Sequence, residues 1–231
     1  CNYFDKIKNN FIKNNNNTIN LIYDIELGKK AYIKKIKFIG DKKIKDRKLR
    51  NVIVSEEVKF WKFISKRKFL DIKRINLDEK LLKNYYKNKG YYKVSIESSS
   101  AKIINESDFE LIFNINAGKK YKFGNLLLEI PDEFNKDNFI NLYKIIEKLE
   151  GKFYSLYKLE DILDEIDKII LQQEFQFSEV KYDQKINNQN INIKIFIEEG
   201  KKQYVERIDI FGNYITEENV IRNSLLIDEG D

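Results

Sequence analysis

The side chains that most often carry enzyme chemistry are scarce in this chain. It contains no His and a single Cys, Cys1, among 231 residues. Without His, a Ser-His-Asp triad, a Cys-His pair and the usual zinc sites are excluded. Carboxylates are plentiful, with 37 Asp and Glu residues, but neither a metal-ligand cluster nor a phosphate-binding loop accompanies them. We therefore predict that the chain is not an enzyme and has no catalytic residue, no metal site and no cofactor.

Basic and aromatic side chains are numerous and could serve to bind an anionic partner. The net charge is +6, from 43 Lys and Arg against 37 Asp and Glu, and 13% of the residues are aromatic. Such a balance is one way to bind nucleic acid or an anionic membrane. The charges are interleaved rather than blocked, however, which is typical of an ordinary solvated surface. Because neither an RNP-like aromatic phrase nor a GxxG clamp is evident, we expect no nucleic-acid partner and keep a basic α+β nucleic-acid-binding module only as an alternative.

A short phrase that occurs three times organises the chain. It reads Gly-Lys-Lys and then Tyr within two residues, and it starts at Gly28, Gly118 and Gly200. Each copy follows a run of alternating apolar residues, which is typical of a strand with one buried face. A phrase that recurs at this spacing indicates an array of small units. We expect the last strands of a preceding unit at 1–29, complete units at 30–118 and 119–200, and the start of a further unit at 201–231.

Each complete unit is predicted to follow the order β-α-α-β-β. In the first unit, strands at 32–39 and 109–117 and a strand after Gly90 accompany a helix near 45–54 and a longer helix with Asn76 as its N-cap. The second unit repeats this order, with Ser155 as the cap of its long helix. Alternating strands supply one apolar face, and amphipathic helices cover it. The prediction is an α+β fold in which two helices cover one face of a three-stranded mixed sheet.

Several motifs resemble the POTRA domains of Omp85-type outer-membrane assembly factors. The segment from Glu56 to Trp61 is similar to an Asp-Glu-Val-Pro-Trp-Trp element of the family. Tyr85-Tyr86 with Gly90-Tyr91 resembles the end of a family helix, and residues 114–118 resemble a strand end with the pattern Asn-Ile-x-Glu-Gly. The segment 205–213, with 220–222, resembles the opening of a fifth POTRA domain. The similarity is colinear over essentially the whole chain, with departures at Pro131 and at Glu174-Phe175. It implies the end of a second domain, complete third and fourth domains, and the start of a fifth.

The resemblance implies a function in the β-barrel assembly machinery, at the periplasmic face of the bacterial outer membrane. Its implied partners are unfolded outer-membrane β-barrel proteins, accessory lipoproteins of the assembly complex, and the membrane through a downstream β-barrel. The chain contains no Met and its pattern starts and stops within a unit, so we expect a segment of a longer protein. The POTRA region of an Omp85 translocation or autotransporter-assembly protein is the alternative within the same superfamily.

The family also implies which sheet edge is exposed. A three-stranded sheet leaves backbone N–H and C=O groups unpaired on its two edge strands, and an extended peptide can add to such an edge as a further strand. In the family, the second strand of the unit is exposed in this way. We therefore expect the client-binding edge to be formed by Tyr92, Val94, Ser95, Ile96, Glu97 and Ser98. The alternative is an edge that is only solvated or is covered by the neighbouring unit.

Two apolar pairs are further candidates for contact with a partner protein. Phe60 and Trp61 lie between the two helices of the first unit, and packing over those helices is the interpretation that we favour for them. Phe11 and Ile12 lie beside the polar turn 14–17 of an expected hairpin. We expect these two side chains in a core, with an exposed apolar tip as the alternative.

Overall fold

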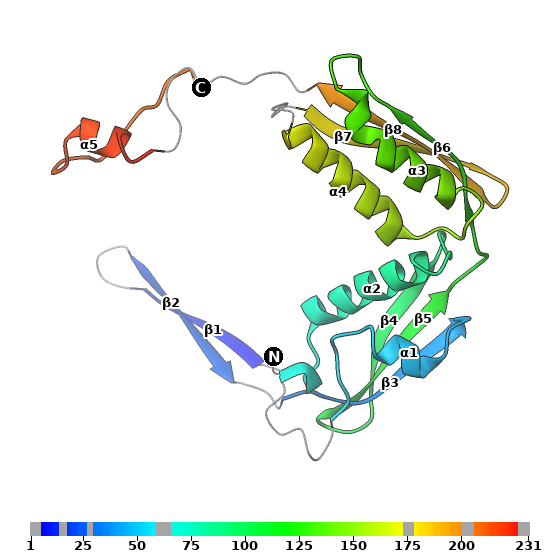
Figure 1. Ribbon diagram of the computed structural model, residues 1–231. Helices are drawn as coiled ribbons and strands as arrows, with labels where there is room; N and C mark the ends of the chain where they lie inside the picture. Colours follow the sequence, from blue (N-terminus) through cyan, green and yellow to red (C-terminus); the bar gives the residue numbers. More distant parts are fainter. Residues whose placement is uncertain are drawn as a thin grey trace.

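The computed structural model describes residues 6–13, 18–26, 30–58, 66–172, 178–199 and 206–225. Its strands form one two-stranded sheet, β1-β2, and two three-stranded sheets with the orders β3-β5-β4 and β6-β8-β7. Each three-stranded sheet has its own helices, and the chain passes from one unit to the other between β5 and β6 (Figure 1). None of the helices in the described ranges is long and apolar enough to span a membrane.

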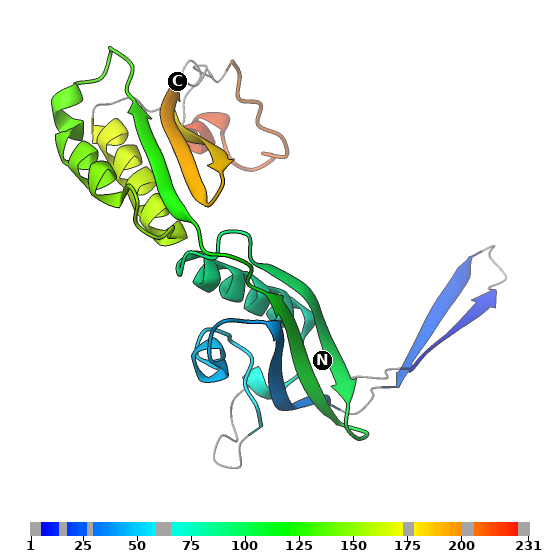
Figure 2. The same ribbon diagram turned by 90° about the vertical axis from the view of Figure 1, so that its right-hand side faces the viewer.

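The first unit has the predicted order β-α-α-β-β. Its central strand β5 runs parallel to β3 and antiparallel to β4, so the sheet is mixed. Alternate side chains of β5 are buried because they point to the same face, and α2 packs on that face with Leu82 and Tyr86 (Figure 2). The elements are β3 (Tyr32–Asp41), α1 (Asp46–Arg50), the short 3₁₀ helix η1 (Lys66–Lys68), α2 (Ile72–Lys87), β4 (Ser95–Ile103) and β5 (Asp108–Asn116).

The second unit repeats this arrangement. Its central strand β8 is parallel to β6 and antiparallel to β7. The helical stripe of α4 is buried as its spacing predicts, at Leu159, Ile162, Ile166 and Ile170. The elements are β6 (Lys122–Glu129), the 3₁₀ helix η2 (Lys136–Phe139), α3 (Ile140–Leu149), α4 (Leu156–Gln172), β7 (Ser178–Asn187) and β8 (Asn190–Glu199). The predicted α+β fold class is confirmed in both units.

The hairpin at the start of the chain forms, but its apolar side chains are not in a core. Strands β1 (Lys6–Lys13) and β2 (Ile19–Glu26) pair antiparallel, with Phe11 opposite Leu21. Phe11 is 71% exposed and Ile12 is 52% exposed, so the expectation that both are buried is wrong for this chain. In the part of the chain that the structure describes, no helix lies against the hairpin as helices do in the two larger units (Figures 1 and 2).

Both helices of the first unit differ from their predicted bounds. The long helix begins after Asp71 rather than after Asn76, because the Asp71 carboxylate accepts a hydrogen bond from the backbone N–H of Arg74 at 3.2 Å. The helix α1 ends at Arg50, several residues before the predicted end. After that point the backbone N–H groups of Val54 and Ser55 donate to the side chain of Asp78 in α2. These two residues therefore do not continue the helix.

The expected strand of the further unit does not form. Residues 206–213 have no strand conformation, and α5 (Glu218–Arg222) is a short helix. In the two complete units the first strand pairs with the last strand of the same unit. No such last strand follows 206–213 in the described part of the chain, so the backbone there lacks the ladder that would hold it extended.

Candidate functional site

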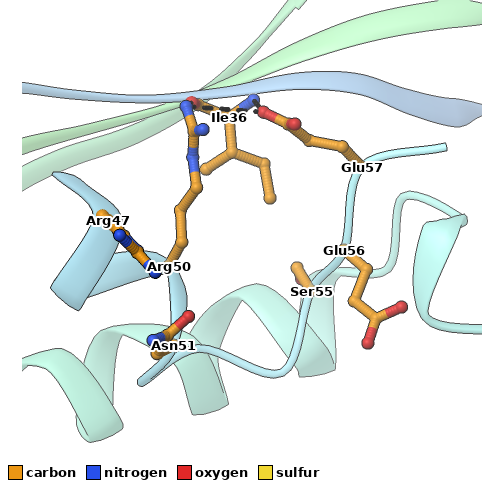
Figure 3. Close-up of a pocket in the computed structure, with 7 residues that line it drawn as sticks. All are labelled: Ile36, Arg47, Arg50, Asn51, Ser55, Glu56 and Glu57. Carbon is orange, nitrogen blue, oxygen red and sulfur yellow. Dashed lines mark hydrogen bonds and ion pairs between the residues drawn. The ribbon is translucent and has the colours of Figure 1, made fainter. Parts of the chain in front are cut away.

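The β3 edge of the first sheet is sealed by side chains. The backbone N–H of Ile36 donates to Oε1 of Glu57 at 2.9 Å, and its C=O accepts from Nη2 of Arg50 at 2.8 Å. Arg50 and Glu57 lie 3.5 Å apart and reach Ile36 from two sides (Figure 3). Further along the edge, the N–H of Val58 donates to the C=O of Ile33 at 2.9 Å. These groups occupy the places of a neighbouring strand, so β3 accepts no added strand without displacing them.

The second unit seals its first strand in a similar way. The N–H of Leu126 in β6 donates to Oε1 of Glu150 at 2.9 Å. Phe123 bonds through its C=O to the N–H of Gly151 and through its N–H to the C=O of Lys152, both at 2.9 Å. A carboxylate that follows the first helical segment therefore satisfies an edge N–H in both units.

The opposite edge of the first sheet, β4, is open. Among the described residues, β4 pairs with β5 alone. Its middle carries the small side chains of 98–101, Ser-Ser-Ser-Ala, which leave the backbone accessible. A bulge lies between Ile96 and Ser98, and the Glu97 carboxylate accepts from the side-chain amides of Asn114 and Asn116 at 3.0 and 3.2 Å. The one acidic side chain of this strand is thus held toward β5.

The hydrogen-bond pattern identifies which backbone groups of β4 face outward. Ile104 donates its N–H to the C=O of Asp108 at 2.9 Å. Because bonded and non-bonded pairs alternate along an antiparallel ladder, Lys102 and Ser100 bond to β5, while Ser99 and Ala101 direct their N–H and C=O groups to the open edge. The Ser99 hydroxyl also bonds to Glu79 of α2, so a strand added here would run beside α2.

The strand predicted at 92–98 is displaced along the chain. Ser95, Ile96, Glu97 and Ser98 lie in β4, but the strand starts at Ser95 and continues to Ile103. Tyr92 lies in the turn before it, and Val94 is only 9% exposed. The expectation that Tyr92 and Val94 belong to the edge strand is wrong, because both side chains pack inward after Gly90 ends the helix.

Tyr92 belongs instead to the joint between the two units. Its ring lies 4.9 Å from that of Tyr154 and 5.8 Å from that of Tyr121, measured between centroids. Its hydroxyl bonds to the side chain of Gln184. Burial raises the pKa of both Tyr92 and Tyr154 above the ordinary value of a tyrosine, so both hydroxyls stay protonated further into the alkaline range.

A side chain of the first unit caps a helix of the second. Asn88, at the end of α2, accepts through Oδ1 from the N–H of Tyr157 at 2.7 Å and from the Ser155 hydroxyl at 3.3 Å. The Ser155 hydroxyl in turn accepts from the N–H of Lys158 at 3.4 Å, as expected of the predicted cap. The first turn of α4 is therefore satisfied jointly by both units.

The open edge of the second sheet is less suited to accept a chain. Strand β7 carries Glu179, Lys181, Asp183 and Lys185 along its length. Lys181 bridges to Glu179 on the same strand and to Glu198 on the central strand β8. Charged side chains of this kind protect edge strands from added partners, whereas β4 offers small uncharged side chains over its middle.

The other candidate contacts are only partly placed. Phe60 and Trp61 lie outside the described residues, so their expected packing stays a prediction. Phe11 and Ile12 are exposed on the hairpin, and their contact with a partner stays a prediction. No group of three or more His, Cys, Asp or Glu side chains that would hold a metal ion is present within the described ranges.

Four functional or structural residues were missed by reasoning from the sequence. Asp78 is fully buried and accepts from the N–H of Val54 at 2.6 Å and of Ser55 at 3.2 Å. Its position four residues before Leu82 on the apolar side of α2 was a usable signal, because a carboxylate there must find buried donors. Arg50 with Glu57, and Asn88, act on residues far along the chain and leave no local signal.

Comparison with known proteins agrees with this geometry. Residues 31–118 match the family model POTRA, described as a surface antigen variable number repeat. Residues 31–118 therefore match a POTRA domain. A solved structure with the same fold is that of POTRA domains 3–5 of Haemophilus influenzae BamA, with a TM-score of 0.61 and 16% identity, covering 87% of this chain and 79% of that chain.

Curated relatives are similar to this chain over nearly its whole length. The outer membrane protein assembly factor BamA of Buchnera aphidicola is 25% identical over 97% of this chain, which spans 36% of that protein. BamA of Neisseria meningitidis is 24% identical over 90% of this chain, which spans 26% of that protein. The chain thus corresponds to about a third or less of the length of these relatives. The predicted resemblance to tandem POTRA domains is confirmed.

Proposed function

We propose that this chain is part of the periplasmic POTRA region of an outer-membrane protein assembly factor and binds unfolded β-barrel proteins along β4. The similarity to BamA proteins supports the assembly role. In this proposal the POTRA units lie at the periplasmic face of the outer membrane, next to a downstream β-barrel. Accessory lipoproteins dock on the same array, with Phe11 and Ile12 of the hairpin as candidate apolar contacts. The units position and bind, and they carry out no catalysis.

The observation that carries this proposal is the difference between the two edges of the first sheet. Glu57 and Arg50 satisfy β3, whereas Ser99 and Ala101 on β4 direct free backbone groups outward. Each added backbone hydrogen bond contributes about 0.5–1.5 kcal/mol net. Four or five such bonds, less the cost of ordering the peptide, give weak binding that does not depend on sequence. Weak and general binding suits the transient handling of many different clients.

Addition of peptides from β-barrel strands should shift the backbone amide signals of the β4 edge. In a ¹⁵N-labelled full chain, the amides of Ser99 and Ala101 should shift with added peptide, because their N–H groups become hydrogen-bonded. The amide of Ile36, which already donates to Glu57 on the sealed β3 edge, should stay in place. An absence of shifts at Ser99 and Ala101 at about millimolar peptide, the range expected for a few net hydrogen bonds, would remove β4 from the proposal.

Substitution of an edge residue by proline tests the same proposal, because it removes one backbone donor from β4. Ala101→Pro removes one outward N–H, and proline is tolerated on edge strands where that N–H faces solvent. We expect peptide affinity to fall about fivefold, the equivalent of one net hydrogen bond. Ala101→Ser keeps the N–H and should bind like the parent chain. Equal affinity of the folded proline variant and the parent, with folding checked by circular dichroism, would contradict binding at this edge.

A further inference from the structure

A groove between the two helices of the second unit has no part in the proposed client binding. It lies between α3 and α4, which run side by side (Figure 1), and has a volume of about 400 Å³. Lining residues recur at helical spacing on both sides, at Asn138, Asn141 and Ile145 and at Asp161, Glu165 and Ile169. With a rise of 1.5 Å per residue, the α4 side from Asp161 to Ile169 is about 12 Å long. The groove therefore follows the helices over about two turns.

The floor of the groove is apolar and is partly open to solvent. Leu142 and Ile162 are buried, whereas Ile145, which lines the same groove, is 46% exposed. A partner that covers Ile145 removes this aliphatic surface from water, which favours association. Because helices pack with the side-chain ridges of one in the grooves of another, the space between α3 and α4 suits the side chains of a third helix.

The charged side chains that line the groove, Asp161 and Glu165, are both acidic. Glu165 bridges to Lys168 on the same helix at 3.2 Å. Asp161 is exposed and has neither a hydrogen-bond nor an ion-pair partner among the described residues. One carboxylate at the rim is therefore available to a cationic side chain of a partner.

Negative charge is concentrated on α4 although the chain as a whole is basic. Within eight residues the helix carries Glu160, Asp161, Asp164, Glu165 and Asp167. Residues 119–200 contain 16 Asp and Glu against 12 Lys and Arg, while the whole chain has a net charge of +6. Burial, together with the neighbouring Asp164, raises the pKa of Asp167, as expected where carboxylates crowd one helix. The partner that complements this surface is basic.

We propose that the groove between α3 and α4 binds a basic amphipathic helix of a partner protein. Apolar side chains of that helix, three or four residues apart, lie between α3 and α4 and cover Ile145, as in other complexes in which a helix occupies a groove. A Lys or Arg side chain beside them pairs with Asp161, and the amides of Asn138 and Asn141 bond to its polar flank. The groove is on the second unit, so this proposal does not depend on client binding at β4.

Three amidated peptides test this assignment on the full chain with labelled Ile methyl groups. The first consists of two Leu-Lys-Lys-Leu-Leu-Lys-Lys repeats, the second has Glu at every Lys position, and the third has Ser at every Leu position. The methyl signal of Ile145 should shift with the Lys peptide and much less with the Glu peptide, because only the former complements Asp161. The Ser peptide should leave it in place, because it has no apolar side chain for the groove. The signals of Ile33 and Ile36 in the first unit should not move.

Matched variants on each helix locate the contact. Ile145→Ser should weaken binding of the Lys peptide about tenfold through loss of buried apolar surface. Ile140→Ser, at a residue of α3 that is 47% exposed but does not line the groove, should change it less than about twofold, because no apolar contact is lost. Asp161→Asn should weaken binding about threefold, the usual size of an exposed ion pair. Asp167→Asn, about a third of a turn away on α4, should change it less than about twofold because of screening. Unshifted signals of Ile193 in β8 would show that each variant is folded.

Four results would overturn this assignment. Absence of an Ile145 shift at about millimolar Lys peptide would leave the groove without this occupant. Equal shifts with the Lys and Glu peptides would show that the acidic rim plays no part. Equal weakening by Ile145→Ser and Ile140→Ser would place the peptide elsewhere. A shift of Ile145 that depends on protein concentration alone, with a doubled mass in analytical ultracentrifugation, would assign the groove to a second copy of this chain.

Discussion

Replacement of Gly40 by alanine should destabilise the first POTRA unit by about 3 kcal/mol or more. Gly40 has φ +84, and a Cβ at this position would lie 2.4 Å from the backbone oxygen of Ile115. Ile115 belongs to the central strand β5, so its backbone cannot move aside without disturbing the whole sheet. Strained backbone and steric overlap therefore add up at one position. Urea unfolding followed through amide signals of β3 and β5 would measure the loss.

Gly118 provides the control for this substitution. Its φ is +66, and no atom lies within 4 Å of the place that a Cβ would take. Gly118→Ala should therefore cost only the left-handed backbone penalty of about 1–2 kcal/mol. Equal losses for the two variants would show that the close approach of Gly40 to β5 has no energetic weight. The second unit, monitored separately through β8, should be unaffected by Gly40→Ala.

Asp78→Ala should have an effect of similar size, for an electrostatic reason. The carboxylate of Asp78 accepts from the N–H groups of Val54 and Ser55, and the residue is fully buried. Its removal leaves two backbone donors without acceptors in a place that water does not reach readily. Each unsatisfied buried donor costs about 1–3 kcal/mol, so we expect a loss of about 3 kcal/mol. The amides of Val54 and Ser55 should also lose their hydrogen-exchange protection.

Asp78→Asn is the matched variant. It keeps the shape of the side chain and one oxygen acceptor, so the loss should be about 1 kcal/mol. A result in which Asn costs as much as Ala would mean that the negative charge, and not the hydrogen bonds, holds the 54–55 segment. A loss below about 0.5 kcal/mol for Asp78→Ala, within the usual range of neutral surface changes, would contradict the structural role assigned to this carboxylate.

The strands and the long helices could be predicted because their pattern is local. Alternating residues in β5 and β8 and the stripe of α4 each carry their own periodic signal. Helix starts were less certain, because Asp71 and Asn76 are both acceptable caps and only the surrounding fold selects Asp71. The strand at 206–213 failed because a strand needs a ladder partner, which periodicity does not supply.

The candidate binding edge, too, could be predicted only in part from the sequence. That a three-stranded sheet has two edges follows from topology, and the resemblance to POTRA domains indicated the second strand. The distinction between a sealed β3 and an open β4 could not be predicted, because it depends on Arg50 and Glu57 meeting at Ile36 from different segments. Tyr92 reads as part of an alternating strand, and only its packing against Tyr154 shows that it is a residue of the joint.

The contact between Asn88 and the start of α4 limits how freely these units can be exchanged during evolution. A helix whose first turn is capped in part by the preceding unit is complete only when that unit is the right neighbour. Recombination that inserted a different unit before residue 119 would take away Asn88 and leave the N–H of Tyr157 and the Ser155 hydroxyl without this acceptor. The order of the two units is therefore a property of the sequence at their boundary, and the array is less modular than its repeated fold suggests.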